Sequence, residues 1–241
     1  MNSFFVSKDD IRNGIILIKG NELLHLNKVL RLKVGDKIIC LSGDNFEYIS
    51  EIISISRTQA EARILDIKEN LRNPKTCIDV FLGLPKGEKL NLITQKLTEL
   101  GVNKLILFES DFTIAKTNPG KLNRLELISQ EACKQCGRSK PLQIENIVRF
   151  KDIGKHIENY EMVIFAYEKA SEENTISNLI AKIKKCNKIA LIIGAEGGFS
   201  EKEDELLKKL NTVQVFLGNR ILRVETACIA LSGFLSLITD N

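Results

Sequence analysis

The sequence predicts an α/β protein, in which a mostly parallel sheet covered by helices follows a small, mostly β unit. Three observations support this fold class. From residue 77 onward, short apolar runs typical of buried strands alternate with segments that have helical spacing. Two of these runs, 189–193 and 213–217, lead directly into loops that contain glycine. Residues 1–70 instead carry strand-like runs separated by polar residues that suit hairpin loops.

The first 70 residues are expected to form a domain with four strands, at 15–18, 37–41, 46–55 and 59–67. Between the first two strands, residues 21–30 have helical spacing, and Asn21 is placed to cap that helix. His25, Lys28 and Arg31 cluster on or just after it. A solvated helix face is the usual reading of such a cluster, and a surface that grips a nucleic-acid backbone is the alternative.

Proline and polar residues interrupt both periodicities at 71–76, which predicts a linker between a domain at 1–70 and a domain at 77–241. In the second domain, Gly101 should stop the first helix, and Ser200 with Glu203 should form a capping box on a later one. The expected strands are 77–84, 103–108, 161–167, 188–193 and 213–217. The expected helices are 88–100, 121–137, 175–185, 201–210 and 225–237.

The last 50 residues hold the candidate active site. In a parallel sheet, ligands bind just beyond the carboxyl ends of the strands, and glycine there lets a ligand approach the main chain. Two such strand ends, at Gly194 and Gly218, are accompanied by charged side chains. These are Glu196, Arg220, Arg223 and Glu225. On these residues alone, the prediction is a ligand held largely by main chain, although glycines at strand ends also occur merely to make turns.

Several function classes lack their motifs. The chain contains no dinucleotide-binding G-x-G-x-x-G, no phosphate-binding G-x-x-x-x-G-K-[ST] and no G-x-S-x-G nucleophile elbow. Cys133 and Cys136 form the one close cysteine pair, and a zinc site needs a second pair at matching spacing. We therefore expect no metal, and we expect these two cysteines to be small apolar residues on a helix face.

Charge and hydropathy indicate where the protein acts. No apolar stretch approaches the roughly 20 residues of a membrane span, and the first residues do not resemble a signal peptide, so a cytoplasmic protein is expected. Residues 84–155 carry thirteen basic groups against eight acidic ones, whereas residues 1–70 are balanced. A basic middle region suits a phosphate-rich partner, and a solvated lysine-rich surface explains it at least as well.

Five sequence segments together resemble one family. The segments IGAEGGFS at 193–200 and LGNRILRVETA at 217–227 closely resemble the RsmE family, the 16S ribosomal RNA uridine-N3 methyltransferases of the SPOUT superfamily. Three further segments agree in order and spacing, so the resemblance covers nearly the whole chain. They are His25 with VLR at 29–31, KGEK at 86–89 through QKLTELGV at 95–102, and EACKQCGR at 131–138.

The resemblance implies both the fold and the activity. It implies a PUA-like β-barrel for RNA, followed by a SPOUT-type mostly parallel α/β domain with a C-terminal trefoil knot. The implied reaction is methylation of N3 of one uridine in small-subunit ribosomal RNA near the decoding centre, with S-adenosylmethionine as the cofactor and S-adenosylhomocysteine as the product. The implied partners are that RNA, within the assembled 30S subunit, and a second copy of the chain bound through the knotted domain.

The resemblance also assigns site residues. It implies a cofactor pocket built mainly of main-chain groups and apolar walls, formed by Gly194, Glu196, Gly198, Leu217, Gly218, Ile221, Leu222, Thr226 and Ala227. The candidates for RNA contact are His25, Arg31, Lys86, Lys89, Lys96 and Arg138. Such phosphate contacts position the substrate but do not choose the base.

Methylation of N3 requires this imide nitrogen to lose its proton and the charge on O2 and O4 to be stabilised. Guanidinium groups suit that task, so Arg223 is the first candidate and Arg220 the second. Glu225 is either the proton acceptor or, more simply, a group that caps the last helix or pairs with Arg223. Two other functions compete with this interpretation. One is 2′-O-methylation of ribose, a reaction of the same superfamily, and the other is RNA binding without catalysis.

Two departures from the family pattern stand out. Ala195 occupies a position where relatives commonly have proline. Ser110 and Asp111 stand where many relatives place Glu-Arg. If that arginine meets RNA or assists the chemistry, another group must replace it, and Lys116 is a candidate.

Overall fold

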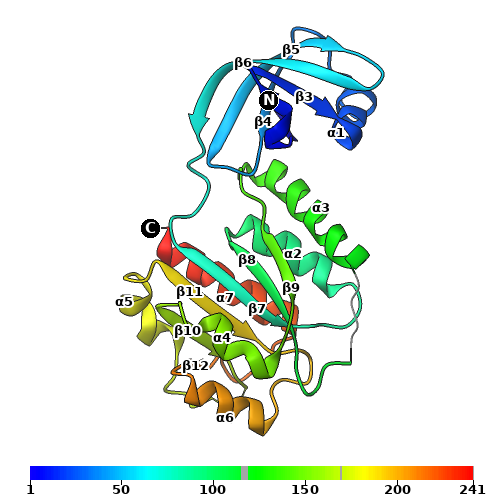
Figure 1. The fold of residues 1–241 in the computed structure, drawn as a ribbon. Coiled ribbons are helices and arrows are strands. Elements are labelled where there is room, and N and C mark those ends of the chain that lie inside the picture. Colours follow the sequence, from blue (N-terminus) through cyan, green and yellow to red (C-terminus); the bar gives the residue numbers. More distant parts are fainter. Residues whose placement is uncertain (115–118, 169, 241) are drawn as a thin grey trace. The chain divides into compact units, whose positions relative to one another are not determined.

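The computed structural model describes residues 1–114, 119–168 and 170–240 (Figure 1). By its internal contacts the chain divides into two compact units. The first consists of Met1–Asn73 with Gln130–Pro141, and the second of Pro74–Ser129 with Leu142–Asn241. The division near residue 73 lies within the expected linker. Residues 130–141, which the sequence assigned to the second domain, pack with the first unit instead.

The first unit is built on a six-stranded sheet in the order β1-β4-β5-β6-β3-β2. Its pairings are antiparallel except for β1, which runs parallel to β4. The strands are β1 (Asn2–Phe5), β2 (Ile11–Arg12), β3 (Ile15–Lys19), β4 (Lys37–Leu41), β5 (Phe46–Ile55) and β6 (Gln59–Glu69). The four predicted strands are confirmed, and the short β1 and β2 were not predicted. This curled sheet is consistent with the expected PUA-like domain.

The predicted helix at 21–30 consists of two pieces, α1 (Gly20–Leu24) and a π-helical turn (His25–Val29). The cap assigned to Asn21 was wrong. The helix begins one residue earlier, so its N-cap is Lys19, which makes no side-chain capping bond, and Asn21 lies inside the first turn. Leu26 anchors this segment in the core of the first unit, among side chains such as Phe4, Ile16, Ile18 and Ile38.

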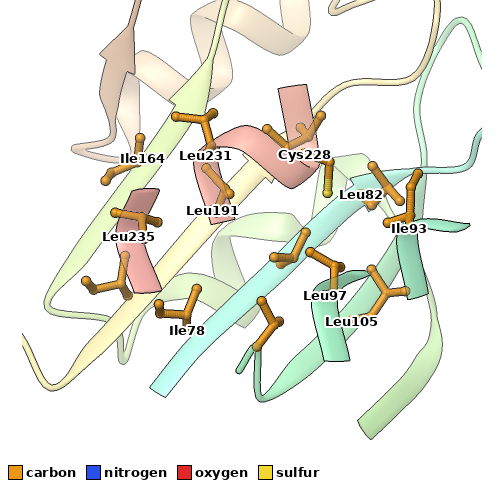
Figure 2. Close-up of a cluster of buried hydrophobic side chains, with 14 of the residues drawn as sticks. Ile78, Leu82, Ile93, Leu97, Leu105, Ile164, Leu191, Cys228, Leu231 and Leu235 are labelled. Atoms are coloured by element: carbon orange, nitrogen blue, oxygen red, sulfur yellow. The ribbon is translucent and has the colours of Figure 1, made fainter. Parts of the chain in front are cut away.

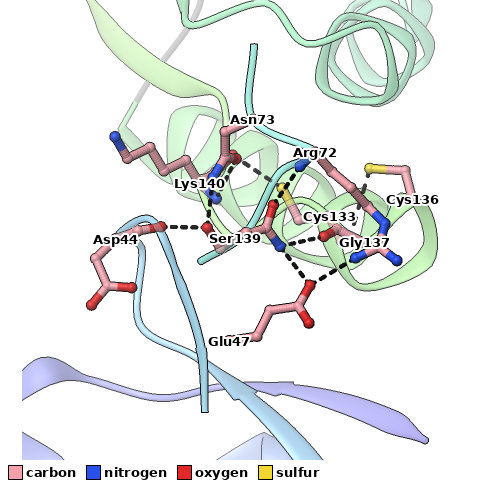
Figure 3. A network of polar contacts seen from close by, with 10 residues as sticks. Asp44, Glu47, Arg72, Asn73, Cys133, Cys136, Gly137, Ser139 and Lys140 are labelled. Atoms are coloured by element: carbon pink, nitrogen blue, oxygen red, sulfur yellow. Dashed lines mark hydrogen bonds and ion pairs between the residues drawn. The ribbon is translucent and has the colours of Figure 1, made fainter. Parts of the chain in front are cut away.

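Polar contacts join residues 130–141 to the rest of the first unit (Figure 3). Asn70 Nδ2 donates to the Gly137 carbonyl at 2.8 Å and to Glu47 Oε1 at 2.8 Å, and Glu47 Oε1 also accepts a hydrogen bond of 2.7 Å from the Arg72 guanidinium. Asn73 Nδ2 donates to Ser139 Oγ at 2.7 Å, and the Ser139 hydroxyl in turn donates to the Asp44 carbonyl. The expected linker therefore begins as a bonded part of the first unit.

The second unit contains a wholly parallel six-stranded sheet, in the order β12-β10-β11-β7-β8-β9. Its strands are β7 (Cys77–Gly83), β8 (Lys104–Glu109), β9 (Gln143–Arg149), β10 (Met162–Ala166), β11 (Lys188–Ile193) and β12 (Val213–Val215). The sheet order reverses on either side of β7: β8 and β9 lie on one side, and β11, β10 and β12 on the other. The carboxyl ends of β7 and β11 therefore flank a switch point, where α/β sheets bind ligands.

Helices cover both faces of this sheet, as the alternation of apolar runs predicted. One face packs on α2 (Lys89–Glu99), α3 (Pro119–Cys136), α5 (Ile180–Ile183) and α7 (Val224–Thr239). Figure 2 shows Ile93 of α2 beside Leu82 of β7, and Leu231 of α7 beside Leu191 of β11. The other face packs on α4 (Ile153–Ile157) and α6 (Glu201–Lys209), with an aromatic cluster that includes Phe108, Phe165 and Phe199.

The helices of the second unit mostly follow their predicted bounds. The capping box at the start of α6 is confirmed, because Ser200 accepts from the Glu203 amide and Glu203 accepts from the Ser200 amide. The segment expected as one helix at 175–185 is a 3₁₀ turn (Ile176–Leu179) followed by the single turn of α5. Strand β9 and helix α4 were not predicted. No helix among the described residues is long and apolar enough to cross a membrane.

Candidate functional site

A cavity of about 480 Å³ opens at the carboxyl ends of β10, β11 and β12. It is formed by the chain just beyond each strand, at 166–168, 193–196 with 198–199, and 216–224, together with Lys89 and Ala227. Its volume lies in the range of small-molecule sites, which is roughly 300–1,000 Å³. The two glycine loops selected from the sequence therefore meet around one cavity.

Eight of the nine residues predicted for the cofactor line this cavity: Gly194, Glu196, Gly198, Leu217, Gly218, Ile221, Leu222 and Ala227. Thr226 is exposed and is not among the lining residues. It faces away because it lies in the first turn of α7, where its neighbour Ala227 is directed inward. The cofactor role of these residues remains a prediction.

The loop after β11 is a tight turn in which Gly194 has little room for a side chain. The Gly198 amide donates to the Ala195 carbonyl at 2.9 Å, and Gly198 has φ +66°, a left-handed conformation that favours glycine. A Cβ atom on Gly194 would lie 3.2 Å from Gly198. On β7, a Cβ atom on Gly83 would lie 2.4 Å from the Ala195 amide nitrogen. The end of β7 thus supports the loop directly through its backbone.

Lys89 bridges two carboxylates at the rim of the cavity. Its Nζ lies 2.8 Å from Glu196 Oε1 and 3.6 Å from Glu225 Oε2. Glu196 Oε1 also accepts a hydrogen bond of 3.1 Å from the Lys86 amide. The hydrogen bond to Glu196 raises the pKa of Lys89. Partial burial raises the pKa of Glu196, but the hydrogen bonds from Lys89 and from main-chain amides outweigh it and leave that pKa lowered.

The Glu196→Gln variant should lower the melting temperature by about 1–3 °C, because the half-exposed ion pair with Lys89 contributes about 0–1 kcal/mol. The contribution of Glu196 is present above its unfolded pKa of 4.5 and is lost as pH falls through its lowered folded pKa. The contribution of Lys89 is present below its unfolded pKa of 10.5 and is lost as pH rises through its raised folded pKa.

The melting-temperature difference between wild type and Glu196→Gln should therefore be constant from pH 6 to 9 and should close in strong acid. Glu172→Gln is the matched control, since Glu172 is exposed and makes no ion pair among the described residues. A difference that varies within pH 6–9 would show that another group titrates at this rim.

Arg220 and Arg223 both line the cavity and are both exposed. Neither guanidinium makes an ion pair or hydrogen bond within the part of the chain that the structure describes. Arg223 is the N-cap of α7 but makes no side-chain capping bond. Two unpaired cations at the mouth of a cavity are available for an anionic or polar substrate.

Glu225 occupies a different place from the one expected. It is not a lining residue, its side chain is 16% exposed, and its ion-pair partner is Lys89 rather than Arg223. Its Oε2 is buried and accepts no hydrogen bond among the described residues. The geometry suits a residue that positions Lys89 better than a proton acceptor in the cavity.

The six candidates for RNA contact differ in their exposure and in the unit to which they belong. Lys86 is exposed, whereas Lys89 belongs to the cofactor rim and Lys96 is paired with Glu99 at 2.9 Å. Arg138 is only 4% exposed, so a surface role for it is not supported. His25 and Arg31 both belong to the first unit. The His25 ring is half-buried, 5.9 Å from that of Phe4, and Arg31 is exposed with φ +53°.

Sequence reasoning missed several lining residues, among them Tyr167, Glu168, Phe216 and Asn219. Tyr167 and Glu168 follow directly after β10, so the strand-end rule applied to that strand would have found them. Phe216 was expected to lie within a strand at 213–217, but β12 ends at Val215, so Phe216 lies just beyond the strand end. Gly83 supports the loop after β11 without lining the cavity. The sequence did not single it out, because it lies inside an apolar run.

The departures at 110 and 111 have a structural role. The Asp111 amide donates to Glu203 Oε1 at 2.9 Å, and Asp111 Oδ2 accepts from the Ser200 hydroxyl at 2.7 Å. Asp111 therefore fastens the loop after β8 to the start of α6. Lys116, the suggested replacement for the missing arginine, lies outside the described residues.

S-adenosylmethionine fits the residues that form the cavity. A purine ring needs apolar walls and main-chain partners, which Leu217, Leu222 and Ala227 and the two glycine loops provide. The cationic sulfonium is compatible with carboxylates, and Glu168 and Glu196 both line the cavity. Among the described residues, no three His, Cys, Asp or Glu side chains are grouped as metal ligands would be.

Comparison with known proteins gives a consistent family. The family model of an RNA methyltransferase domain matches residues 72–236, and that of an RNA methyltransferase PUA domain matches residues 18–65. The chain is 32% identical to ribosomal RNA small subunit methyltransferase E of Bacillus subtilis, covering 87% of this chain and 85% of the relative. It is 33% identical to the protein of the same name from Buchnera aphidicola subsp. Schizaphis graminum, covering 90% and 88%.

Solved structures support the same assignment. A methyltransferase of Legionella pneumophila in complex with bound S-adenosylmethionine has a TM-score of 0.87 and 25% identity, covering 98% of this chain and 96% of that one. The ribosomal RNA small subunit methyltransferase E of Neisseria gonorrhoeae, at 22% identity and a TM-score of 0.87, shares the fold over 99% of this chain and 98% of that one. The chain belongs to the family of ribosomal RNA small subunit methyltransferase E.

Proposed function

We propose that this protein transfers a methyl group from S-adenosylmethionine to N3 of one uridine in small-subunit ribosomal RNA. The observation that carries the proposal is the cavity itself. In a chain of this methyltransferase family, a backbone-lined cavity of cofactor size has at its mouth two arginines that pair with no other described residue. Those arginines are suited to a substrate that gains negative charge as it reacts.

The cofactor is held by main chain and by apolar side chains. The loop 194–198 and the loop 217–222 supply amides and carbonyls, and Ala227 closes one wall. Lys89 fixes the rim by pairing with Glu196 and Glu225. Bound there, S-adenosylmethionine supplies an electrophilic methyl group, and the protein supplies orientation and charge.

The chain's own contribution to the chemistry is electrostatic. Loss of the N3 proton spreads negative charge over the two flanking carbonyl oxygens of uracil. Arg223 is assigned to stabilise that charge, because its guanidinium stays ionised, offers several donors and has no competing partner among the described residues. Arg220 has the same properties and is the second candidate. Glu225 is assigned to the placement of Lys89 instead of proton transfer.

The RNA is expected to contact both units, each through its own surface. In the first unit, His25 and Arg31 are the candidates for backbone contact, and in the second Lys86 is exposed with an ammonium that has no partner among the described residues. Contacts of this kind fix register and add a salt-dependent share of the affinity. The proposal includes action in the cytoplasm on the assembled 30S subunit, as a homodimer with a knotted second domain.

Transfer of a labelled methyl group from S-adenosylmethionine tests this function. We expect labelled methyl groups in the RNA of 30S subunits that lack the modification. The amount of label in naked RNA should be at least about tenfold lower, because naked RNA must first be ordered before the protein can bind it and extrude the target base. Cofactor binding without any transfer to either substrate would contradict the proposal and favour an RNA-binding factor without catalysis.

A further inference from the structure

A second cavity, of about 520 Å³, lies beside the cofactor cavity in the same unit. It opens at the carboxyl ends of β7, β8 and β11 and shares Ala195 and Glu196 with the first cavity. Its other lining residues are Leu84, Lys86, Asp111, Phe112, Ile114 and Gly197. A molecule seated there would lie against the same turn of chain that bounds the cofactor.

The loop that presents Phe112 is held in place on both sides. The Ser110 amide donates to Thr113 Oγ1 at 2.8 Å, and the Thr113 amide donates to the Ser110 carbonyl at 3.0 Å. Asp111 is bonded to Glu203 and Ser200 at the start of α6, at 2.9 and 2.7 Å. The aromatic ring is therefore displayed by a closed turn that is anchored to a helix.

Phe112 is fixed at its base and exposed at its ring. A Cβ atom on Gly197 would come within 2.7 Å of the Phe112 Cβ, so the base of the side chain already packs against the cofactor loop. The residue as a whole is nevertheless 48% exposed, and Ile114 is 73% exposed. A rigid, half-exposed aromatic ring beside an apolar side chain is a surface suited to a flat ring.

The charges around the cavity favour a neutral occupant. Among the described residues, two carboxylates, those of Asp111 and Glu196, line the cavity against one ammonium, that of Lys86. The carboxylate of Glu196 is already engaged by Lys89 and by the Lys86 amide. Because Glu196 is paired with Lys89, the described lining offers no excess of positive charge to a phosphate group, whereas an uncharged base with carbonyl oxygens could accept a hydrogen bond from Lys86.

We propose that this second cavity receives the extruded target base, with Phe112 as its stacking surface and Lys86 as a donor to one of its carbonyl oxygens. Lys86 then shares with Arg223, at the mouth of the adjoining cofactor cavity, the stabilisation of the charge that the base gains when N3 loses its proton. The inference rests on the proposed function, since an enzyme that modifies a base within structured RNA takes it out of its stack. The common wall at Ala195 and Glu196 places an occupant next to the cofactor. Phe112 is a positioning residue for the substrate.

The Phe112→Ala variant should lower kcat/KM for RNA by about 5- to 150-fold, the range that corresponds to loss of one base–aromatic stacking contact. Alanine keeps the Cβ that packs against Gly197, so the cofactor dissociation constant should change by less than about twofold. Phe112→Trp should restore most of the rate. The matched control is Leu127→Ala, because Leu127 is 55% exposed on α3 in the same unit and lines neither cavity.

A kcat/KM within twofold of wild type in Phe112→Ala overturns the inference. So does a loss that is matched by an equal loss of cofactor affinity, since that outcome assigns Phe112 to the cofactor loop alone. Methylation at a position other than N3 contradicts the proposed function, but the ratio between variant and wild type still decides the role of Phe112.

A second readout does not depend on turnover. RNA that carries 5-iodouridine at the target position should photocrosslink to the peptide containing residues 110–114 in the complex with S-adenosylhomocysteine. Crosslinks confined to other peptides would overturn the inference even if the wild-type protein transfers no methyl group.

Discussion

Replacing Arg223 by alanine should lower kcat by roughly 10²–10³-fold, the usual loss when one preorganised donor to a developing negative charge is removed. Arg223 lines the cofactor cavity, is exposed and has no partner among the described residues, so its removal leaves no buried group unsatisfied. The dissociation constant for S-adenosylmethionine should therefore change by less than about threefold. Single-turnover transfer and calorimetric titration measure the two quantities separately.

Two further variants define the role of this guanidinium. Arg223→Lys keeps the charge but loses the planar arrangement of donors, so an intermediate rate is expected. Arg220→Ala should cost less than Arg223→Ala, since Arg220 is the second candidate. An unchanged kcat in Arg223→Ala, or a larger loss in Arg220→Ala, would contradict the assignment of Arg223.

Replacing Gly83 by alanine should weaken cofactor binding by roughly 100-fold or more, with a loss of stability of about 1–3 kcal/mol from overpacking. The new Cβ would lie 2.4 Å from the Ala195 amide nitrogen and 3.0 Å from the Gly194 carbonyl carbon. Strand β7 is paired on both sides, with β8 and β11, so the cofactor loop is the part that must move. Calorimetric titration and urea denaturation measure the two effects.

Gly233→Ala is the matched control for this substitution. Gly233 lies in α7, and its added Cβ would meet Leu100 at 3.6 Å, an ordinary packing distance. Alanine in a helix interior is favoured over glycine by about 0.5–1 kcal/mol, so this variant should be slightly more stable than wild type and should bind the cofactor normally. Normal cofactor binding by Gly83→Ala would show that the loop after β11 is not supported by β7 in the way described.

Much of the fold could be predicted because its signals are local. Strand β11 and helix α6 have their expected starts, since an apolar run and a capping box are properties of neighbouring residues. Strand β9 was missed because Gln143–Arg149 neither alternates regularly in polarity nor contains a long apolar run, since the strand is half-exposed at the sheet edge. The knot stays a prediction from the resemblance, since no local pattern encodes how the chain threads.

The site could be predicted only in part. Its glycine loops stand out in the sequence, and both meet around the cofactor cavity. The partner of Glu225 could not be foreseen, because Lys89 is 136 residues away and the pairing depends on how α2 and α7 pack. The burial of Arg138 was equally hidden, since a basic residue in a polar stretch is normally exposed.

The central claim is the identity of the reacting atom, and nucleoside analysis tests it most directly. Small ribosomal subunits that lack the modification are incubated with the protein and S-adenosylmethionine, and the RNA is digested and analysed by mass spectrometry. The account predicts N3-methyluridine at a single position, formed by wild type and nearly absent with Arg223→Ala. A ribose-methylated nucleoside would contradict it and assign the protein to 2′-O-methylation.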